Sequence, residues 1–524
     1  MANWLRLRLG QAVFVAILLG AAAVRFPCLD SLPAGVNQDE ASAAIEAWFL
    51  AHFGADRWGN AYPAYFLGWG SGQNALLSYL LAPLVGRFGL SIVVVRFVPA
   101  VFGLLAAIAA YLLARAQTDR RGALLAMAIV AFAPWNVMAS RWALESNLAP
   151  ALVALGLFGL QRALDAEGAR AARWFYVAAT FLAVSLYAYA AVLAPLAILA
   201  LLIAVLRRRW LWAQRRELIG PALLFSSLAA PFLLVLLKNY VLHGPPPFEA
   251  GLPFTLPLFE NSRLAEIGGG GMARILAENA GFLLSGLRDG LPWSHPAGIA
   301  PLPLVVLPLA AFGAWVKLRA GKTDVAALLV CSVCATAPFI PMNVNRVNIV
   351  FIPLAALAGF GATRLSDMLE NKRLRLAFAA ALGVALLAPT AEFYQVYAGG
   401  DFNRSIAGPF RVDLPEALRI AKARPAQSGP ILLDLPGGLI YALLLFHDPS
   451  SIPAFVVRTR EAAPFDRLQG DAFGRYYFSR EKLRADGVNE FVVIERKEAP
   501  PCDVSTPVAQ AGLLRVFECG ASKQ

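Results

Sequence analysis

Two adjacent carboxylates, Asp39 and Glu40, follow the first long apolar segment of the chain. That segment runs from about Leu9 to Phe26, so a helix formed by it would leave a membrane shortly before the acidic pair. An acidic pair at such a position is costly unless water, a cation or a substrate meets it. We therefore interpret Asp39 and Glu40 as a candidate functional site.

The same stretch also has a purely structural interpretation. Asn37 and Glu40 have the spacing of a capping box, and Asp39 would lie at the positive end of the helix that follows. Apolar residues then recur at helical spacing until Gly54. Glu40 is therefore either a cap or a functional group, whereas capping does not require Asp39.

Four further charged residues are predicted to face the same side of the membrane as this pair: Arg96, Arg141, Glu145 and Arg346. Each also has a simpler explanation, because an arginine can extend to lipid headgroups and Glu145 can pair with Arg141 at helical spacing. Several arginines beside an acid suit a ligand that carries phosphate, which guanidinium groups hold by paired hydrogen bonds.

The composition indicates a membrane protein with many crossings. Of the 524 residues, 58% are hydrophobic and only 15% are charged, whereas a soluble domain has about a quarter charged residues. The formal charge of +12 does not require nucleic acid, since the basic residues lie in short loops between apolar segments. Residues 9–26 lack a clean cleavage site, so we expect a retained helix with the N-terminus inside.

The apolar segments predict an all-α membrane domain, residues 1–390, with about eleven crossings. Residues 73–88 form an apolar segment interrupted by Pro83, and we expect them to lie at the membrane surface. A long outer loop is expected over residues 238–300. The predicted crossings are residues 9–26, 91–114, 122–138, 148–164, 174–189, 190–206, 218–237, 302–316, 325–340, 347–362 and 376–389.

Residues 391–524 differ in composition and predict a small α/β domain outside the cytoplasm. We expect strands at 430–435, 490–495 and 513–518, and helices at 415–422 and 439–445. The turn Pro436-Gly437-Gly438 after a strand is a weak sign of a phosphate loop and more often only a turn. Cys502 and Cys519 can pair if this domain lies outside the cytoplasm.

An ordered set of residues resembles a known family, the bacterial branch of the protein O-mannosyltransferase and aminoarabinose transferase superfamily. These are membrane glycosyltransferases of the GT-C fold, similar to glycosyltransferase family 39. The resemblance covers roughly the first two hundred residues and is weaker as far as Pro389. The residues that carry it are Arg25, Asp39-Glu40-Ala41, Gly54, Tyr62-Pro63, Gly89, Arg96, Ala133-Pro134, Ser140-Arg141, Glu145 and Asn345-Arg346.

The resemblance implies an inverting hexosyl- or pentosyltransferase in the cytoplasmic membrane. It would move a sugar from a polyprenyl-phosphate donor to the hydroxyl of a lipid, glycan or protein acceptor, such as lipid A, at the outer face. Asp39 would be the general base, and Glu40 and Glu145 would orient either Asp39 or an arginine. Arg96 would stabilise the leaving phosphate, with Arg141 and Arg346 as further candidates, and Tyr62 would contact substrate.

Cofactor use and the class of the protein stay open at this stage. The carboxylates could hold a divalent cation, but the outer loops show no histidine cluster at ligand spacing, and His243 and His295 are interpreted as ordinary loop residues. A lipid-linked-sugar flippase or another transporter is one alternative, although such proteins show repeated halves. A non-enzymatic assembly protein of the cell envelope is the other alternative.

Overall fold

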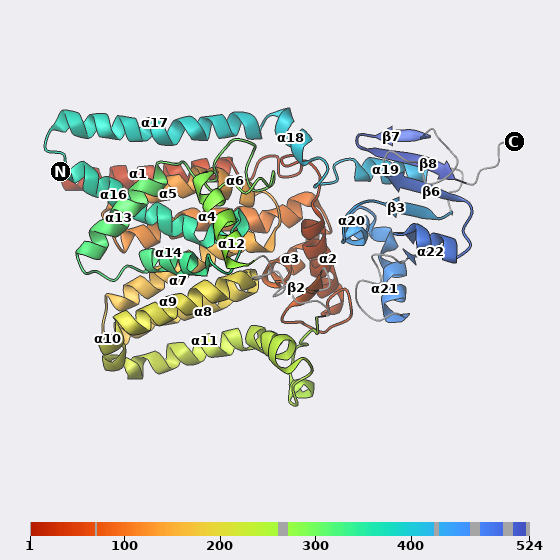
Figure 1. Cartoon of the computed structure of the whole chain (residues 1–524), viewed down its shortest axis with the longest axis horizontal. Coiled ribbons are helices and arrows are strands. Elements are labelled where there is room, and N and C mark those ends of the chain that lie inside the picture. Colours follow the sequence, from red (N-terminus) through yellow and green to blue (C-terminus); the bar gives the residue numbers. More distant parts are fainter. Residues whose placement is uncertain are drawn as a thin grey trace.

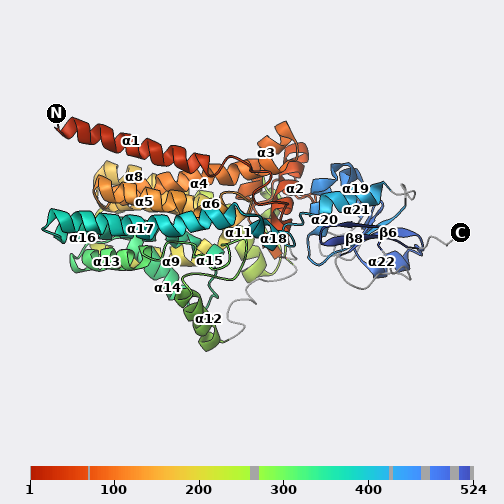
Figure 2. The same cartoon turned by 90° about the horizontal axis from the view of Figure 1, so that it is seen from above.

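The computed structural model describes residues 2–68, 71–259, 271–423, 429–461, 472–495 and 507–519. Long helices run side by side in one bundle, and a β-sheet with its own helices lies beyond one end of that bundle (Figures 1 and 2). The N-terminus lies at the opposite end of the bundle from the sheet. Helix α2 lies across the bundle end that faces the sheet (Figure 1).

Each predicted crossing coincides with a helix of the bundle. Six helical segments among the described residues are long and apolar enough to span a membrane, and four more apolar helices are shorter. The multi-pass character is confirmed, but the count of eleven crossings is not established. The bundle helices are α1 (Ala2–Ala23), α4 (Ile92–Arg115), α5 (Arg120–Phe132), α7 (Ala149–Leu164), α8 (Gly168–Ala188), α9 (Leu193–Leu206), α11 (Arg215–Leu236), α13 (Val306–Arg319), α14 (Val325–Thr336), α16 (Phe351–Met368) and α17 (Lys372–Tyr397).

Close helix contacts in the bundle depend on glycine. A Cβ placed on Gly359 of α16 would come within 2.2 Å of the carbonyl oxygen of Gly122 in α5. On the same helix, a Cβ on Gly361 would come equally close to the carbonyl oxygen of Leu309 in α13. Small residues allow this approach, and apolar helices without a hydrophobic driving force in lipid rely on such packing.

Shorter elements connect the bundle helices. The predicted surface helix is α3, and the long loop expected over residues 238–300 contains helix α12, which the sequence analysis missed. Gly and Pro residues around this amphipathic segment had favoured a loop. The connecting elements are α2 (Gln38–Phe53), β1 (Phe66–Gly68), β2 (Ser71–Gln73), α3 (Leu76–Phe88), α6 (Pro134–Ala139), η1 (Glu145–Leu148), η2 (Ala190–Val192), α10 (Arg208–Ala213), η3 (Leu237–Leu242), η4 (Glu249–Gly251), α12 (Met272–Leu284), α15 (Val344–Val347) and η6 (Asn348–Val350).

The C-terminal part contains a six-stranded sheet with strand order β4-β5-β3-β6-β8-β7. Strand β3 is parallel to both β5 and β6, and the remaining pairs are antiparallel. The five predicted elements of this part are present, whereas α18, η7, β4, β5, β7, α21 and α22 were not predicted. The elements are α18 (Gly400–Ile406), α19 (Leu414–Lys422), β3 (Ile431–Asp434), α20 (Ile440–His447), η7 (Pro449–Ser451), α21 (Ile452–Glu461), β4 (Ala472–Phe473), β5 (Tyr476–Tyr477), α22 (Arg480–Ala485), β6 (Phe491–Glu495), β7 (Ala509–Ala511) and β8 (Leu514–Cys519).

The predicted division after residue 390 falls inside α17, which continues to Tyr397. Cys519 is disulfide-bonded, and the predicted partner Cys502 lies outside the described residues.

Candidate active site

The acidic pair begins helix α2 as predicted. Asn37 caps the helix and forms the expected capping box with Glu40, so Asp39 and Glu40 both lie in the first turn. Gly54 ends the helix with φ of 63°, a left-handed conformation that glycine adopts readily. The positive end of the helix dipole therefore lies beside both carboxylates.

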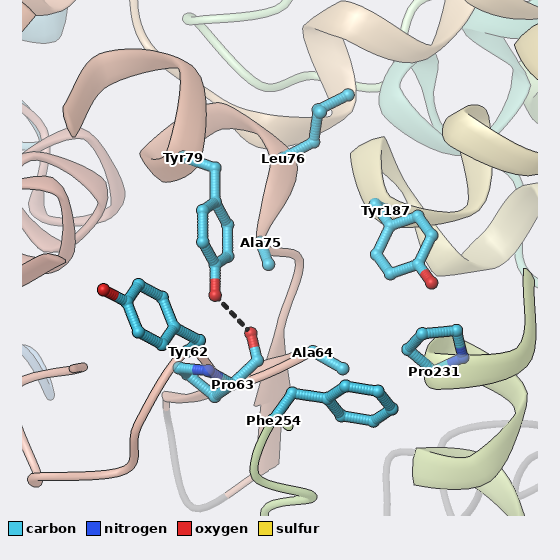
Figure 3. A pocket seen from close by; sticks show the side chains of 9 residues that line it. All are labelled: Tyr62, Pro63, Ala64, Ala75, Leu76, Tyr79, Tyr187, Pro231 and Phe254. Carbon is cyan, nitrogen blue, oxygen red and sulfur yellow. Dashed lines mark hydrogen bonds between the residues drawn. The ribbon is translucent and has the colours of Figure 1, made fainter. Parts of the chain in front are cut away.

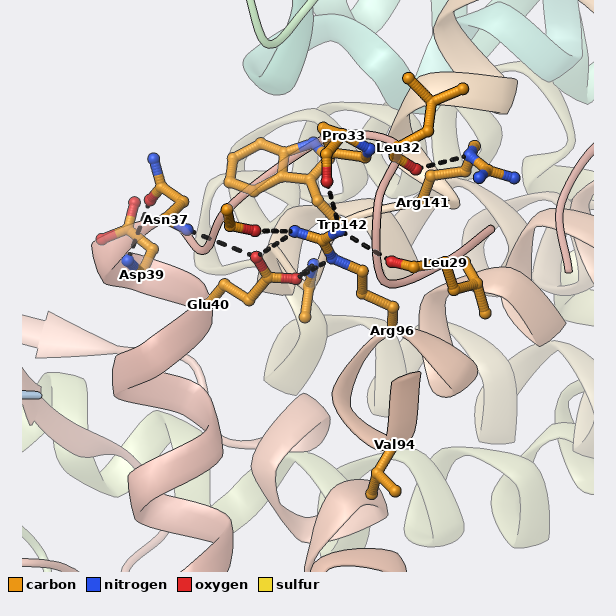
Figure 4. A network of polar contacts seen from close by, with 12 residues as sticks. Leu29, Leu32, Pro33, Asn37, Asp39, Glu40, Val94, Arg96, Arg141 and Trp142 are labelled. Carbon is orange, nitrogen blue, oxygen red and sulfur yellow. Dashed lines mark hydrogen bonds and ion pairs between the residues drawn. The ribbon is translucent and has the colours of Figure 1, made fainter. Parts of the chain in front are cut away.

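Glu40 is more than a helix cap, because it forms a two-pronged ion pair with Arg96 (Figure 4). Arg96 donates from Nε to Oε1 over 2.7 Å and from Nη2 to Oε2 over 2.9 Å. Oε1 also accepts the backbone N–H of Ala143. Glu40 is only 1% exposed and Arg96 is fully buried. A buried pair of this geometry is expensive to break, since one charge would be left without a partner.

The rest of the Arg96 guanidinium is used by the backbone of the preceding loop. Each remaining N–H donates to a carbonyl oxygen, over 2.7–2.8 Å, and these oxygens belong to Leu29, Pro33 and Gly35. All five N–H groups of Arg96 are thus occupied. Arg96 does not extend to lipid headgroups, and a phosphate would have to displace one of these buried bonds.

Arg141 has a matching role on the other side of the same loop. It is 3% exposed and its five N–H groups also donate to backbone carbonyls. The alternatives of headgroup contact and of pairing with Glu145 therefore do not describe its position. The carbonyls that it binds are those of Val24, Arg25, Pro27, Cys28 and Leu32. Together, Arg96 and Arg141 hold residues 24–35 against the bundle.

Asp39 lies on the other side of Asn37 from the Glu40–Arg96 pair, and its carboxylate points away from Arg96 (Figure 4). Asp39 is half-buried, in contrast to the buried Glu40 beside it. The two neighbouring carboxylates thus have different surroundings. Asp39 is therefore the more accessible member of the pair.

A cavity of about 640 Å³ lies at this end of the bundle, lined mainly by apolar and aromatic side chains. Helices α9 and α11 provide much of its wall, and Arg346 is the one arginine that lines it. Arg96 and Arg141 do not line this cavity, and they do not line a second, smaller cavity near Tyr62 that is described below. The surroundings of Arg346 therefore differ from those of the other two arginines. An apolar cavity with a few polar groups has the general form of a ligand site.

The segment that carries Arg346 is held by residues that the sequence analysis missed. Asn279 of α12 donates to the carbonyl oxygens of Ala337 and Ile340 and accepts the backbone N–H of Met342. These three contacts lie just before and within the turn in which Arg346 Nη1 donates to Pro341 O over 2.9 Å. The only hint in the sequence was an asparagine on the apolar side of the unrecognised helix α12.

Asp289 holds the same segment from the loop that follows α12. Its Oδ2 accepts the backbone N–H of Val344 over 3.0 Å. Burial disfavours its charge, but hydrogen bonds from His295 and from the backbone N–H groups of Leu291 and Val344 hold the pKa of Asp289 below its ordinary value. His295, predicted to be an ordinary loop residue, is buried and pairs with this carboxylate.

Glu145 does not line the cavity itself but binds Asn74, which does. The carboxylate of Glu145 accepts both the backbone N–H and the side-chain amide of Asn74, over 3.1 and 2.6 Å. The side-chain oxygen of Asn74 in turn accepts the backbone N–H of Ala190. Asn74 and Ala190 both line the cavity, so Glu145 positions two parts of its wall.

Tyr62 lines a second, smaller cavity of about 280 Å³ (Figure 3). This cavity is also apolar, and Tyr79 closes one side by donating to the carbonyl oxygen of Pro63 over 3.0 Å. Tyr62 is 58% exposed and has φ of 40°. The cavity that Tyr62 lines therefore includes neither Arg96 nor Arg346. Among the described residues, no group of three or more His, Cys, Asp or Glu side chains is arranged to hold a metal ion.

Comparisons with known proteins agree on the fold. Residues 75–234 match the family described as dolichyl-phosphate-mannose-protein mannosyltransferase. No curated protein matches the chain. The structure of ArnT from Cupriavidus metallidurans bound to undecaprenyl phosphate is similar with a TM-score of 0.61 and 15% identity, over 97% of this chain and 98% of that chain. Its apo structure has a TM-score of 0.58 and 14% identity, over 99% and 98%.

A second fold relative is the archaeal oligosaccharyltransferase AglB from Archaeoglobus fulgidus in complex with an inhibitory peptide and a dolichol-phosphate. It has a TM-score of 0.55 and 14% identity, over 94% of this chain and 70% of that chain. At these identities the structures establish the fold. The predicted resemblance to the family 39-like membrane glycosyltransferases of the GT-C superfamily is confirmed.

Proposed function

Starting from this GT-C fold, we propose that the chain is an inverting glycosyltransferase with a polyprenyl-phosphate sugar donor. The observation that carries the proposal is the apolar cavity of about 640 Å³ with Arg346 in its lining. Apolar walls match an isoprenoid chain, and a guanidinium group matches the phosphate that follows it. The fold relative bound to undecaprenyl phosphate is consistent with this class of donor.

In the proposed reaction Asp39 is the general base. It takes the proton of the acceptor hydroxyl while that oxygen attacks the anomeric carbon of the sugar. The bond from this carbon to the phosphate oxygen breaks, and the lipid phosphate leaves with the electron pair. A single displacement of this kind inverts the sugar configuration.

Arg346 takes the role that the sequence analysis gave first to Arg96. A fixed guanidinium beside the leaving phosphate would stabilise the negative charge that grows there. Glu40, Arg96 and Arg141 then act as positioning residues, because they hold α2 and residues 24–35 in place. Glu145 positions Asn74 at the cavity, and Tyr62 stays a candidate for substrate contact in the smaller cavity.

We further assign the site and residues 391–524 to the outer face of the cytoplasmic membrane. Basic residues gather in the loops at the bundle end where the N-terminus lies, and the candidate site and the sheet lie at the opposite end (Figure 1). The disulfide of Cys519 supports an oxidising compartment for the sheet. The acceptor is a hydroxyl of a lipid, glycan or protein.

The proposal is tested by incubating the purified protein with polyprenyl-phosphate sugars and an acceptor extract. We expect release of free polyprenyl phosphate together with a glycosylated acceptor, and neither product with Asp39→Asn. A flippase would move the intact donor between leaflets without cleaving it. Movement without cleavage, or an equal yield from the Asp39→Asn variant, would contradict the proposal.

A further inference from the structure

A second buried arginine network lies next to the candidate site and includes a residue from the C-terminal sheet region. Its centre is Arg57, which follows α2 and is 1% exposed. Arg57 donates from Nε to Glu46 Oε1 over 2.6 Å, and its backbone N–H donates to Glu46 Oε2 over 3.0 Å. The side chains of both residues are fully buried.

The same guanidinium joins three segments that are far apart in the sequence. Nη2 donates to the backbone and side-chain oxygens of Ser42 in α2, and Ser42 Oγ donates to Gln73 Oε1 of β2 over 2.9 Å. Nη1 donates to the hydroxyl of Tyr441 in α20 over 3.1 Å. One buried cation therefore contacts α2, reaches the β1–β2 hairpin through Ser42, and contacts the C-terminal part.

Two of the three segments border the candidate site, and the third packs against α2. Ser42 lies one helical turn after Asp39 on the same face of α2. Gln73 directly precedes Asn74, which lines the larger cavity. Tyr441 stacks on Phe455 at 5.8 Å between ring centroids, and Phe455 also meets Phe49 of α2.

The loop before Asp39 meets the C-terminal part as well. The backbone N–H of Val36 donates to the carbonyl oxygen of Phe410 over 2.6 Å. A Cβ placed on Gly437, in the turn after β3, would lie 2.9 Å from the side-chain oxygen of Gln38. Gly437 also has φ of 130°, which side chains rarely adopt. This turn, interpreted from the sequence as a weak phosphate-loop signal, thus packs against the residue before Asp39.

We propose that Arg57 is a positioning residue that sets the orientation of α2, and with it Asp39, according to whether the C-terminal part is docked through Tyr441. The proposal rests on the function proposed above. A buried ion pair adds little net stability compared with well-packed apolar residues, so its value lies in the geometry that it imposes. Here that geometry links the base to the cavity wall and to the C-terminal sheet region.

The most selective variant is Tyr441→Phe, which removes the hydroxyl that Arg57 binds and keeps the ring stacked on Phe455. Its matched control is Tyr476→Phe, which removes a buried hydroxyl that donates to Asp448 within the C-terminal part. Both variants lose one buried hydrogen bond, so similar small losses of thermal stability are expected. Only the first variant breaks a contact with Arg57, which binds α2.

The measurements are steady-state sugar transfer and amide hydrogen exchange of the purified full-length protein. Tyr441→Phe is expected to lower kcat about tenfold with little change in the KM for the donor, because a small misplacement of a base slows the chemical step. Exchange at the start of α2 should become faster in this variant. Tyr476→Phe should change neither kcat nor exchange in α2.

Equal effects of both variants on kcat and on exchange in α2 would overturn the proposal, since the hydroxyl of Tyr441 would then act only on general stability. Unchanged exchange in α2 with Tyr441→Phe would also overturn it. If the wild-type protein transfers no sugar, the proposed function fails, while the exchange comparison still decides whether Arg57 links α2 to the C-terminal part. Arg57→Lys adds a second check, because a lysine cannot bind Glu46, Ser42 and Tyr441 together, so it should mimic Tyr441→Phe in exchange.

Discussion

The loop of residues 24–35 and the large apolar cavity use arginine in opposite ways. Arg96 and Arg141 give every N–H group to carbonyl oxygens or to Glu40, so they fix the backbone in front of α2. Arg346 is only partly buried and lines the large apolar cavity. The three arginines predicted to face the same side of the membrane therefore divide into two that hold the backbone and one that lines the large cavity. The three side chains carry the same charge, so their burial and their hydrogen-bond partners distinguish these two uses.

The largest expected effect tests whether Arg96 holds residues 24–35 in place. Arg96→Met leaves Glu40 buried without its partner, which should cost about 3–5 kcal/mol of stability. The measurement is the midpoint of thermal unfolding, together with the yield of protein after solubilisation. Arg346→Met serves as the control and should have a clearly smaller effect. Equal stability of the two variants would mean that the Glu40–Arg96 pair does not hold the loop.

The next effect separates the two carboxylates of α2. Asp39→Asn should lower turnover by about a hundredfold, the usual contribution of a general base, with an unchanged unfolding midpoint. Glu40→Gln should instead lower the unfolding midpoint, because Arg96 loses its charged partner. Turnover and thermal unfolding of both variants check this division. Near-normal turnover of Asp39→Asn would remove it from the mechanism.

Substitution by lysine sharpens the comparison between the arginines. Arg346→Lys keeps the charge but loses the planar fork, and loss of one charge-assisted bond costs about 1.5–3 kcal/mol. We expect kcat/KM for the donor to fall roughly ten- to a hundredfold with normal stability. Arg96→Lys should mainly reduce stability. If Arg96→Lys instead lowered kcat/KM and Arg346→Lys lowered only stability, Arg96 would be the residue that binds the phosphate.

The smallest effect concerns the support of Arg346. Asp289→Asn removes the charge that accepts the backbone N–H of Val344, so the turn before Arg346 should loosen. A loss of about 1 kcal/mol in donor binding, or roughly fivefold in KM, is expected, while turnover at saturating donor stays normal. Asp486→Asn, at an exposed position in the C-terminal part, provides the background value. A fall in kcat without a change in KM would contradict this role, because Asp289 would then affect the chemical step rather than donor binding.

The sequence was sufficient for the elements with strong local signals. The capping box at Asn37, the end of α2 at Gly54 and the helices of the bundle follow from spacing and from apolar segments alone. The acidic pair was found in the same way, because carboxylates next to an apolar segment are unusual.

The hydrogen-bond partners of the buried arginines could not be predicted from the sequence, because these bonds join residues that are distant in the chain. Arg96 meets carbonyls more than sixty positions away, and Arg57 meets Tyr441 from the far end of the chain. Helix α12 and its Asn279 were missed because Gly and Pro residues around a short amphipathic segment favoured a loop. The role of Arg141 could not be read from its spacing to Glu145, since both side chains bind elsewhere.

The most direct test of this account is a structure of the full-length protein in lipid nanodiscs with undecaprenyl phosphate added. The account predicts the phosphate beside the guanidinium of Arg346 and the isoprenoid chain along α9 and α11. The Glu40–Arg96 pair and the bonds from Arg141 to residues 24–35 should remain as they are. A phosphate bound by Arg96 or Arg141, or an isoprenoid chain outside this cavity, would contradict it.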